Sequence, residues 1–539
     1  MNSLLLITIA LCLFIIAYFT YGRWLAKKWG IDINRTAPSE YLEDNVDYVP
    51  TDAKVVLGHH FSSIAGAGPI TGPILASIFG WLPVYLWIIF GSIFIGGVHD
   101  FSSLFASIRH DGKSIGQIMK VNVGKRGKFL FNLFSYAAII LVVAAFTDIC
   151  AGTFQYLSSD SQNLTGARAG TSSLLFIVLA IIFGYFVYRK SSKLWIATIA
   201  GIIALFICIV IGFYFPVVKL SKTGWDIVLI IYITIASILP VWILLQPRDY
   251  LCSFLLYAMI IGGFLGVIFT APTLKLPAYI GFSVNNQTLF PFLFVTVACG
   301  AVSGFHSLVS SGTTAKQIKS EKDTQLIGYG AMLIEGVIAV LALISVAYVK
   351  KAEGSPAIIF ANGIANFMHT FGLPIETGRV FITLTFSAFA LTSLDTATRI
   401  ARYLFQELFD DAKEPIKKIF SNMYVATGIT VLLSAILLSY GYDKIWPIFG
   451  SSNQLLAALS LLAVSVWLSK KGKKTIMTII PMIFMFIVTL AALVLLVKTN
   501  LFTATPNYTL GIIAIVLLIL AIVIVIESFT SLRKAKKNN

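Results

Sequence analysis

The sequence predicts an all-α polytopic membrane protein with about fifteen transmembrane helices. Of the 539 residues, 58% are hydrophobic and only 12% are charged, and the mean hydropathy is +0.88. A soluble domain has roughly twice that share of charged residues. In addition, many apolar runs reach about 18 residues, the length that crosses the hydrocarbon core of a bilayer.

Taken in order, the apolar runs predict a chain of spans joined by short loops. Residues 3–22 have no basic region before them and no small-residue cleavage site after them, so we interpret them as a span and not as a signal peptide. The loop 23–56 is too short to form a domain of its own, and segment 355–372 is expected to be re-entrant or interfacial. The expected spans are 3–22, 57–80, 84–107, 129–151, 173–188, 194–217, 225–246, 251–271, 290–311, 326–349, 377–397, 419–440, 445–468, 475–497 and 508–528.

The distribution of basic residues predicts the orientation. If the N-terminus is outside, the segments that fall inside hold 31 of the 40 Lys and Arg residues, including the tail 529–539. Cytoplasmic loops are enriched in these residues. We therefore expect a cell-membrane protein with a cytoplasmic C-terminus, and a full span at 355–372 would destroy this pattern. The same bias accounts for the net charge of +16 without nucleic acid as a partner.

Segment 58–73 is the most unusual of the predicted spans. It contains four glycines, two prolines and five polar side chains, although it should lie within the membrane. Glycine and proline weaken a helix, and lipid cannot satisfy the freed backbone groups. We therefore predict a broken helix that faces protein or a water-filled cavity, as in a transport site. Its candidate substrate- or ion-binding residues are Ser62, Ser63, Gly66, Ala67, Gly68 and Thr71, with His59 and His60 at the inner mouth.

Further polar residues fall within other predicted spans, where they are costly and by default mark function. In the predicted topology nearly all of them lie in the cytoplasmic half of a span, as expected for a shared hydrated pathway. The alternatives to a functional role are structural: histidines at the membrane interface, a polar pair that holds helices together, an arginine that reaches the interface, and hydroxyls that hydrogen-bond to the backbone. The additional candidates are His99, Asp100, Gln246, Arg248, Asp249, Ser303, His306, Ser310, Ser311, Thr313, Thr314, Glu335 and Asp395.

Two more glycine-rich stretches, 300–312 and 450–452, are predicted to break their spans, although close helix packing is the alternative. We expect no metal site, since adjacent histidines point to different faces of a helix and no motif such as HExxH is present. The five cysteines show no CxxC spacing and are expected to be small core residues without disulfides. No cofactor is expected beyond a coupling proton or sodium ion.

Six segments carry a resemblance to a known family. The sequence resembles the carbon starvation protein A (CstA) family of membrane transporters, from residue 55 to about residue 460. The matching segments are GHHFSSIAGAGPI (58–70), GGVHD (96–100), LLQPRDYL (244–251), GAVSGFHSLVSSGTT (300–314), SLDTATR (393–399) and WPIFGSSNQLLA (446–457).

The resemblance implies secondary active uptake of a small nutrient, pyruvate or short peptides, in carbon-starved cells. It also implies the five-plus-five inverted repeat of the amino acid–polyamine–organocation superfamily, with a core at 56–400, an N-terminal helix and loop at 1–55 and a C-terminal four-helix region at 401–539. The repeats are expected to begin at 57 and 225, with Pro240 and Pro247 marking the second discontinuous helix.

Alternating access around the broken segment is the expected mechanism. A substrate carboxylate would be held by backbone N–H groups at a half-helix N-terminus. Sodium would suit the hydroxyls of 310–314 with carbonyls of 65–68, whereas a proton would use Asp100, Glu335, Asp395 or a histidine. A channel or uncoupled facilitator for small carboxylates is the alternative. We expect neither an enzyme nor an ATP-driven pump, because no nucleophile–base spacing and no P-loop motif is present.

Overall fold

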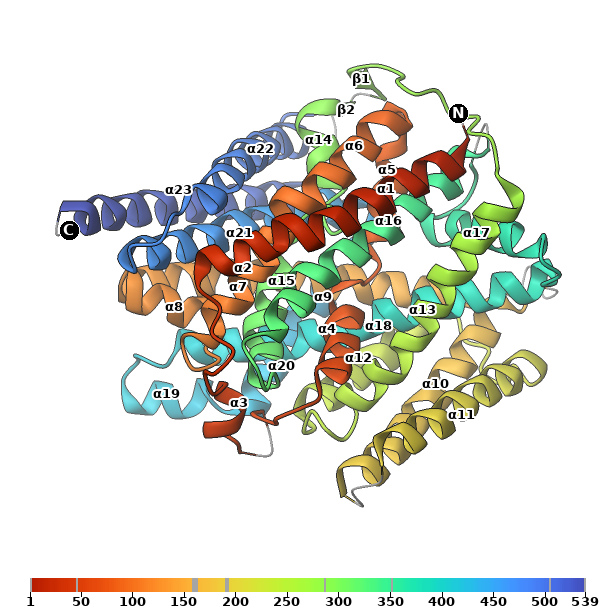
Figure 1. Cartoon of the computed structure of the whole chain (residues 1–539), viewed down its shortest axis with the longest axis horizontal. Helices are drawn as coiled ribbons and strands as arrows, with labels where there is room; N and C mark the ends of the chain where they lie inside the picture. Colours follow the sequence, from red (N-terminus) through yellow and green to blue (C-terminus); the bar gives the residue numbers. More distant parts are fainter. Residues whose placement is uncertain are drawn as a thin grey trace.

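The protein is mostly helical, which confirms the predicted all-α class (Figure 1). The computed structural model describes residues 2–44, 47–157, 163–189, 193–285, 287–349, 352–503 and 506–537. The strands among these residues are β1 (Ser283–Val284) and β2 (Gln287–Thr288), which form a short antiparallel hairpin.

The helices follow the chain with few long connections. Four π-helical segments, Tyr18–Gly22, Ser92–Gly96, Tyr185–Arg189 and Gln325–Gly330, extend neighbouring α-helices. The α-helices are α1 (Ser3–Ala17), α2 (Arg23–Trp29), α3 (Pro38–Tyr41), α4 (Ala53–Ile64), α5 (Gly68–Ala76), α6 (Trp81–Gly91), α7 (Gly97–Ile108), α8 (Ile115–Asn122), α9 (Lys125–Phe154), α10 (Thr165–Gly184), α11 (Leu194–Tyr214), α12 (Lys222–Ile238), α13 (Leu245–Thr270), α14 (Leu289–Thr296), α15 (Gly304–Gly312), α16 (Ala331–Ala347), α17 (Pro356–His369), α18 (Ile375–Leu408), α19 (Glu414–Phe420), α20 (Met423–Leu438), α21 (Tyr442–Lys470), α22 (Ile476–Leu501) and α23 (Tyr508–Lys537).

Twelve helical segments among the described residues are long and apolar enough to cross a membrane. A thirteenth is counted if α19 and α20, which meet at an angle of 64°, form one span. Two of the fifteen predicted spans are absent from this set, because α12 has only 17 residues and segment 290–311 is divided between α14 and α15. The count of fifteen therefore stays a prediction. Segment 355–372 forms α17, whose 14 residues are too few to cross.

The helices differ in how deeply they are buried. α16, α18, α21 and the α4–α5 pair lie in the interior, whereas α11 packs at one edge of the molecule beside α10 and α13 (Figure 1). Among the apolar side chains of α11 only Leu205 is buried, as expected where lipid replaces protein as the neighbour. α9 runs along α18 in the most extensive helix–helix contact of the described chain.

The break in the first unusual span lies where the sequence places it. α4 ends at Ile64 and α5 begins at Gly68, so Ala65–Ala67 are not helical. Pro69 has no N–H to donate and disfavours a helical residue before it, which is harmless only in the first turn of a helix. The local sequence therefore ends one helix and starts the next.

The second interrupted span differs from the prediction. α14 ends at Thr296, residues 297–303 are not helical, and α15 begins at Gly304. The break thus precedes most of the predicted stretch 300–312, and His306 lies within α15 and not in the break. The prediction of a break at 450–452 is wrong, since α21 is continuous there. Gly450 is instead a site of close packing, where an added Cβ would lie 2.5 Å from the carbonyl oxygen of Val295.

The segment Gln246–Asp249 also lies elsewhere than expected. It does not close the span at 225–246 but forms the first turn of α13, after a turn at 239–244. The predicted domain boundary at residue 400 falls inside α18, and the division into three regions stays a prediction.

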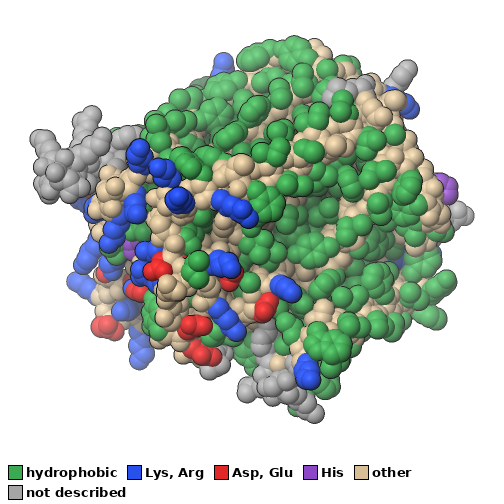
Figure 2. Space-filling view, in the orientation of Figure 1, with side chains coloured by type: hydrophobic (Ala, Val, Ile, Leu, Met, Phe, Trp, Pro, Cys, Tyr) green, Lys and Arg blue, Asp and Glu red, His purple; other side chains and the backbone are tan. Residues whose placement is uncertain are grey.

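Charged side chains gather at one end of the molecule, around α2, α3, α8 and α19, while the rest of the visible face is mostly apolar (Figure 2). α9 starts at this charged end with Lys125, Arg126 and Lys128, and α18 finishes there. Part of the predicted basic segment 189–193 and the side chains of the basic tail after residue 530 lie outside the described residues.

Candidate functional site

A cavity of about 1210 Å³ enters the protein from the end opposite the charged one. It is lined by the loop after α9, the start of α10 and the start of α17, and Thr71 and Phe386 are also among its lining residues. Thr71 is one turn from the start of α5, so the cavity approaches the first break. The break residues Ala65–Ala67 are buried and do not line the cavity.

The two breaks lie against each other. A Cβ added to Gly68 would lie 2.4 Å from the sulfur of Cys299, and one added to Gly72 would lie 2.6 Å from the carbonyl oxygen of Thr296. On its other side, the first break packs against α9 and α18, because a Cβ on Gly66 would lie 2.5 Å from Ser393 Oγ. Glycine is required at these positions for the close approach of two interrupted helices.

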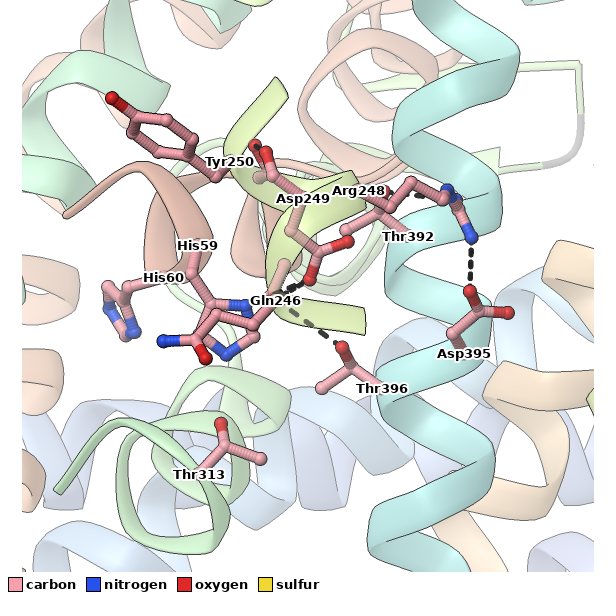
Figure 3. Close-up of polar contacts among 12 residues, drawn as sticks. His59, His60, Gln246, Arg248, Asp249, Tyr250, Thr313, Thr392, Asp395 and Thr396 are labelled. Atoms are coloured by element: carbon pink, nitrogen blue, oxygen red, sulfur yellow. Dashed lines mark hydrogen bonds and ion pairs between the residues drawn. The ribbon is translucent and has the colours of Figure 1, made fainter. Parts of the chain in front are cut away.

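Four residues form a cluster around a guanidinium group, here called the guanidinium cluster: Tyr232, Arg248, Thr392 and Asp395, of which all but the half-buried Tyr232 are buried. Arg248 reaches from the first turn of α13 to Asp395 on α18 and forms an ion pair with it (Figure 3). Tyr232 donates a hydrogen bond to Asp395 Oδ2 at 2.6 Å and accepts one from Arg248 at 2.5 Å. Arg248 Nη2 also donates to Thr392 Oγ1 at 3.1 Å. Arg248 is only 2% exposed, so it does not reach an interface as an isolated arginine would.

His59 and the two serines of α4 converge on Asp249 of α13. His59 Nδ1 lies 2.9 Å from Asp249 Oδ2, Ser63 Oγ donates to the same oxygen at 3.4 Å, and Ser62 Oγ donates to the backbone oxygen of Asp249 at 3.0 Å. Gln246 on the same turn donates to Thr51 Oγ1. These contacts fasten α4 to α13 at the charged side of the first break.

The hydroxyls of 310–314 do not converge on the first break. Ser311 and Thr313 donate to carbonyl oxygens of their own helix, and Thr314 Oγ1 lies 2.9 Å from His60 Nδ1. Ser310 Oγ is buried without a hydrogen-bond partner among the described residues. In this conformation, hydroxyl bonds to backbone are the main role of Ser311 and Thr313.

A second buried cluster, here called the histidine cluster, joins His99, Asp100, His306 and Glu335. His99 Nδ1 lies 2.7 Å from Asp100 Oδ1, and His306 Nδ1 lies 2.8 Å from Asp100 Oδ2. The other ring nitrogen of His306, Nε2, lies 3.5 Å from Glu335 Oε2. α7, α15 and α16 supply these side chains, and all four are 0% exposed. The four residues were separate candidates in the sequence, and the fold places them in one chain of contacts.

Several residues that contact these clusters and the breaks are not predicted from the sequence. Ser303 is a predicted site residue, whereas its partner Asn453 belongs to the matching segment 446–457 without a predicted role. Asn453 Oδ1 accepts a hydrogen bond from the N–H of Phe305 at 2.8 Å and thus satisfies a free donor at the start of α15. Tyr232 and Thr392 complete the guanidinium cluster, and Cys299 contacts the first break. No short-range signal identifies these roles, because each depends on a partner far away in the sequence.

Metal ligation is not suggested by these side chains. Among the residues that the structure describes, no group of three or more His, Cys, Asp and Glu side chains has a geometry that could hold a metal ion. The cysteines within that part of the chain are free thiols.

Comparison of the sequence with protein families gives a match along nearly the whole chain. The family described as "Carbon starvation protein CstA" matches residues 2–354 and 349–492. The peptide transporter CstA of Bacillus subtilis is 31% identical over 591 residues, which cover 98% of this chain and 96% of that protein. The peptide transporter CstA of Campylobacter jejuni is 32% identical, covering 91% and 79%. The pyruvate/proton symporter BtsT of Escherichia coli is 30% identical, covering 94% and 82%.

Comparison with solved structures indicates the fold. A crystal structure of the Eremococcus coleocola manganese transporter aligns with a TM-score of 0.52 at 12% identity, covering 92% of this chain and 99% of that one. A crystal structure of its H236A mutant aligns with a TM-score of 0.51 at 11% identity, with the same coverage of both chains. At this level of identity the likeness concerns the fold alone.

Proposed function

Because this chain belongs to the carbon starvation protein CstA family, we propose that it takes up a small nutrient, pyruvate or short peptides, by secondary active transport during carbon starvation. It is a multi-pass cell-membrane protein, and its relatives are named as peptide transporters and as a pyruvate/proton symporter. The observation that carries the proposal is a large cavity that reaches α5 of the first interrupted helix pair. This pair in turn packs against the second interrupted pair, α14–α15.

Alternating access is the mechanism that this geometry favours. Although Lys222 and Arg379 line the cavity, it opens at the end away from the main gathering of Lys and Arg residues, and basic residues favour the cytoplasmic side. We therefore assign the cavity to the outside, with the C-terminus inside, and the conformation to an outward-open state. The inner side is closed by α4, which is fastened to α13 through His59, Ser62 and Asp249.

The interrupted helices also suggest how an inverted repeat would be arranged. We place the start of the second repeat at α14 and not at residue 225, because α14–α15 is the interrupted partner of α4–α5. The contact between α9 and α18 would then join the third members of the two repeats. Inverted repeats with discontinuous helices at the bilayer midplane are a common plan of secondary transporters.

Substrate carboxylate binding is assigned to the N-terminus of α5. The first N–H groups of a helix lack intrahelical partners, and the helix dipole favours an anion there. Thr71, one turn further along, lines the cavity and adds a hydroxyl. The hydroxyls of Ser62 and Ser63 bond to Asp249 in this conformation, so their contact with substrate would require α4 to move away from α13.

Uptake into proteoliposomes tests this function. Purified protein is reconstituted, and radiolabelled pyruvate and radiolabelled dialanine are offered under an imposed proton gradient, an imposed sodium gradient, or neither. We expect accumulation above the outside concentration of at least one substrate under one gradient. Equilibration without accumulation would replace the proposal by an uncoupled facilitator, and electrical currents far above transporter turnover would replace it by a channel.

The break itself is tested with a pair of glycine variants. Gly68→Ala brings a Cβ into contact with Cys299, a clash that costs roughly 1–3 kcal/mol and shifts the two breaks apart, so uptake should fall. Gly428→Ala on α20 is the matched control, because nothing lies within 4 Å of an added Cβ there. Equal uptake by both variants would contradict a role of the packed breaks in transport.

A further inference from the structure

The contact between His306 and Glu335 lacks a proton donor unless one extra proton is bound. Asp100 lies within hydrogen-bond distance of the Nδ1 atoms of both His99 and His306. An ionised carboxylate only accepts hydrogen bonds, so both Nδ1 atoms carry the donated hydrogens. A neutral His306 then presents a lone pair at Nε2, and this lone pair faces the carboxyl oxygen Oε2 of Glu335 at 3.5 Å.

Two acceptors facing each other in the protein interior are unfavourable. Neither His306 Nε2 nor either Glu335 oxygen has a hydrogen-bond partner among the described residues, although all are fully buried. One bound proton resolves the conflict. It resides either on Glu335, which then donates to His306, or on His306, which then forms an ion pair with the Glu335 carboxylate.

No fixed positive charge replaces this proton. Within the described part of the chain, no Lys or Arg forms an ion pair with Asp100 or Glu335. The neighbouring titratable groups are Cys299, which lies in the second break, and His60 on α4, whose Nδ1 lies 2.9 Å from Thr314. Loss of the proton therefore leaves two carboxylates around one neutral imidazole, a costly arrangement in low dielectric.

The proton site is joined to the interrupted helix. His306 is in the first turn of α15, which starts directly after the second break. Glu335 is on α16, whose Ala339 packs against Gly300 in that break. Gaining or losing a proton between these two residues thus changes the attraction between α15 and α16.

We propose that the His306–Glu335 pair is the site that binds the coupling proton, one proton per transport cycle. In the loaded state the proton bridges Glu335 Oε2 and His306 Nε2, and in the empty state both atoms are without it. Asp100 and His99 hold the His306 ring in position and keep its Nδ1 protonated. This inference rests on the proposed function, since it names the coupling group of that transport.

The decisive experiment separates accumulation from exchange. Glu335→Gln keeps the size of the side chain but cannot lose a proton. In proteoliposomes under an inward proton gradient of one pH unit, wild-type protein with one-to-one coupling can accumulate substrate about tenfold. We expect Glu335→Gln to accumulate none, while still exchanging labelled for unlabelled pyruvate or dialanine across the membrane. Accumulation by Glu335→Gln equal to that of the wild type would overturn the assignment.

Glu407→Gln is the matched control. Glu407 is also a carboxylate within a membrane helix, but it accepts hydrogen bonds from Ser114 and Asn132, so its carboxyl group already has neutral donors. This variant should accumulate substrate as the wild type does. If it lost accumulation to the same extent as Glu335→Gln, the effect would not be specific to the His306–Glu335 pair and the proposal would fail.

An optical readout tests the proton site without any substrate. Infrared difference spectra recorded on changing pH should contain a protonated-carboxyl band that shifts in D₂O, disappears in Glu335→Gln and persists in Glu407→Gln. Identical spectra for wild type and Glu335→Gln would refute the assignment of the proton site to the His306–Glu335 pair, even if Glu335→Gln were inactive in transport. Conversely, a wild type without any gradient-driven accumulation would refute the proposed function, while the infrared band would still report on the site.

Discussion

The charged side chains of the guanidinium cluster and of the histidine cluster are all buried, but the two clusters balance their charges in opposite ways. Arg248 and Asp395 pair one permanent cation with one carboxylate. A guanidinium group does not lose its proton in proteins, so the positive charge of this cluster is fixed. In the histidine cluster two carboxylates share only histidines, whose charge depends on bound protons.

This difference suggests different roles for the two clusters. A buried ion pair whose members both make further hydrogen bonds holds helices together, here α12 and α13 with α18. Asp395 makes these contacts through Oδ2 alone, and its Oδ1 has no hydrogen-bond partner among the described residues. A cluster whose balance requires a mobile proton responds to the proton gradient. A buried charge therefore does not by itself identify the coupling site. The coupling site is better identified by asking whether the positive charge that balances a buried carboxylate can leave as a proton.

The largest effect is expected from breaking the fixed pair. Asp395→Leu leaves the guanidinium group of Arg248 buried without a counter-charge, which should cost about 3–5 kcal/mol of unfolding free energy. The double variant Arg248→Met with Asp395→Leu removes both charges and should recover most of that loss. Denaturant unfolding of the detergent-solubilised protein measures both. Equal destabilisation of the single and double variants would show that the unpaired charge is not the cause.

A smaller loss is expected for Asp100→Asn in the histidine cluster. The asparagine oxygen can still accept from one histidine, and the other histidine can lose its charge or shift its ring proton, which arginine cannot do. We expect a cost of about 1–3 kcal/mol, typical of one unsatisfied buried hydrogen-bonding group. The same unfolding assay applies, with the half-exposed Asp411→Asn as a control that should change stability by less than about 1 kcal/mol. A loss larger than that of Asp395→Leu would reverse the comparison.

Local chemistry explains what the sequence could predict. The break after Ile64 follows from Gly66, Gly68 and Pro69, which are neighbours in the chain. The membrane class follows from composition in the same way. The sequence also predicts every titratable member of both clusters except Tyr232 as a site residue, because polar residues within apolar segments are conspicuous.

The sequence-based predictions fail where the local structure depends on residues that are far away in the chain. Pro240 and Pro247 resemble a broken span, but Pro240 lies in the turn after α12 and Pro247 lies in the first turn of α13, where proline is tolerated. Gly450 lies in a glycine-rich stretch of the kind that breaks a helix, but in the structure it allows close packing against Val295. The true second break depends on Asn453, about 150 residues further along, which satisfies the start of α15. Without related sequences, no periodicity or spacing connects such partners.

The smallest effect on stability is expected for Glu335→Gln, and this variant gives the sharpest comparison. The same chemical change, carboxylate to amide, at Asp395 should destabilise strongly, because the amide of Asp395→Asn cannot neutralise Arg248. At Glu335 no cation loses its partner, and the amide can donate to His306 as the protonated acid does. The unfolding free energy should therefore change by less than about 1 kcal/mol. If Glu335→Gln destabilised the protein as much as Asp395→Asn, Glu335 would have to compensate a fixed positive charge. The histidine cluster would then be a structural ion pair like the guanidinium cluster.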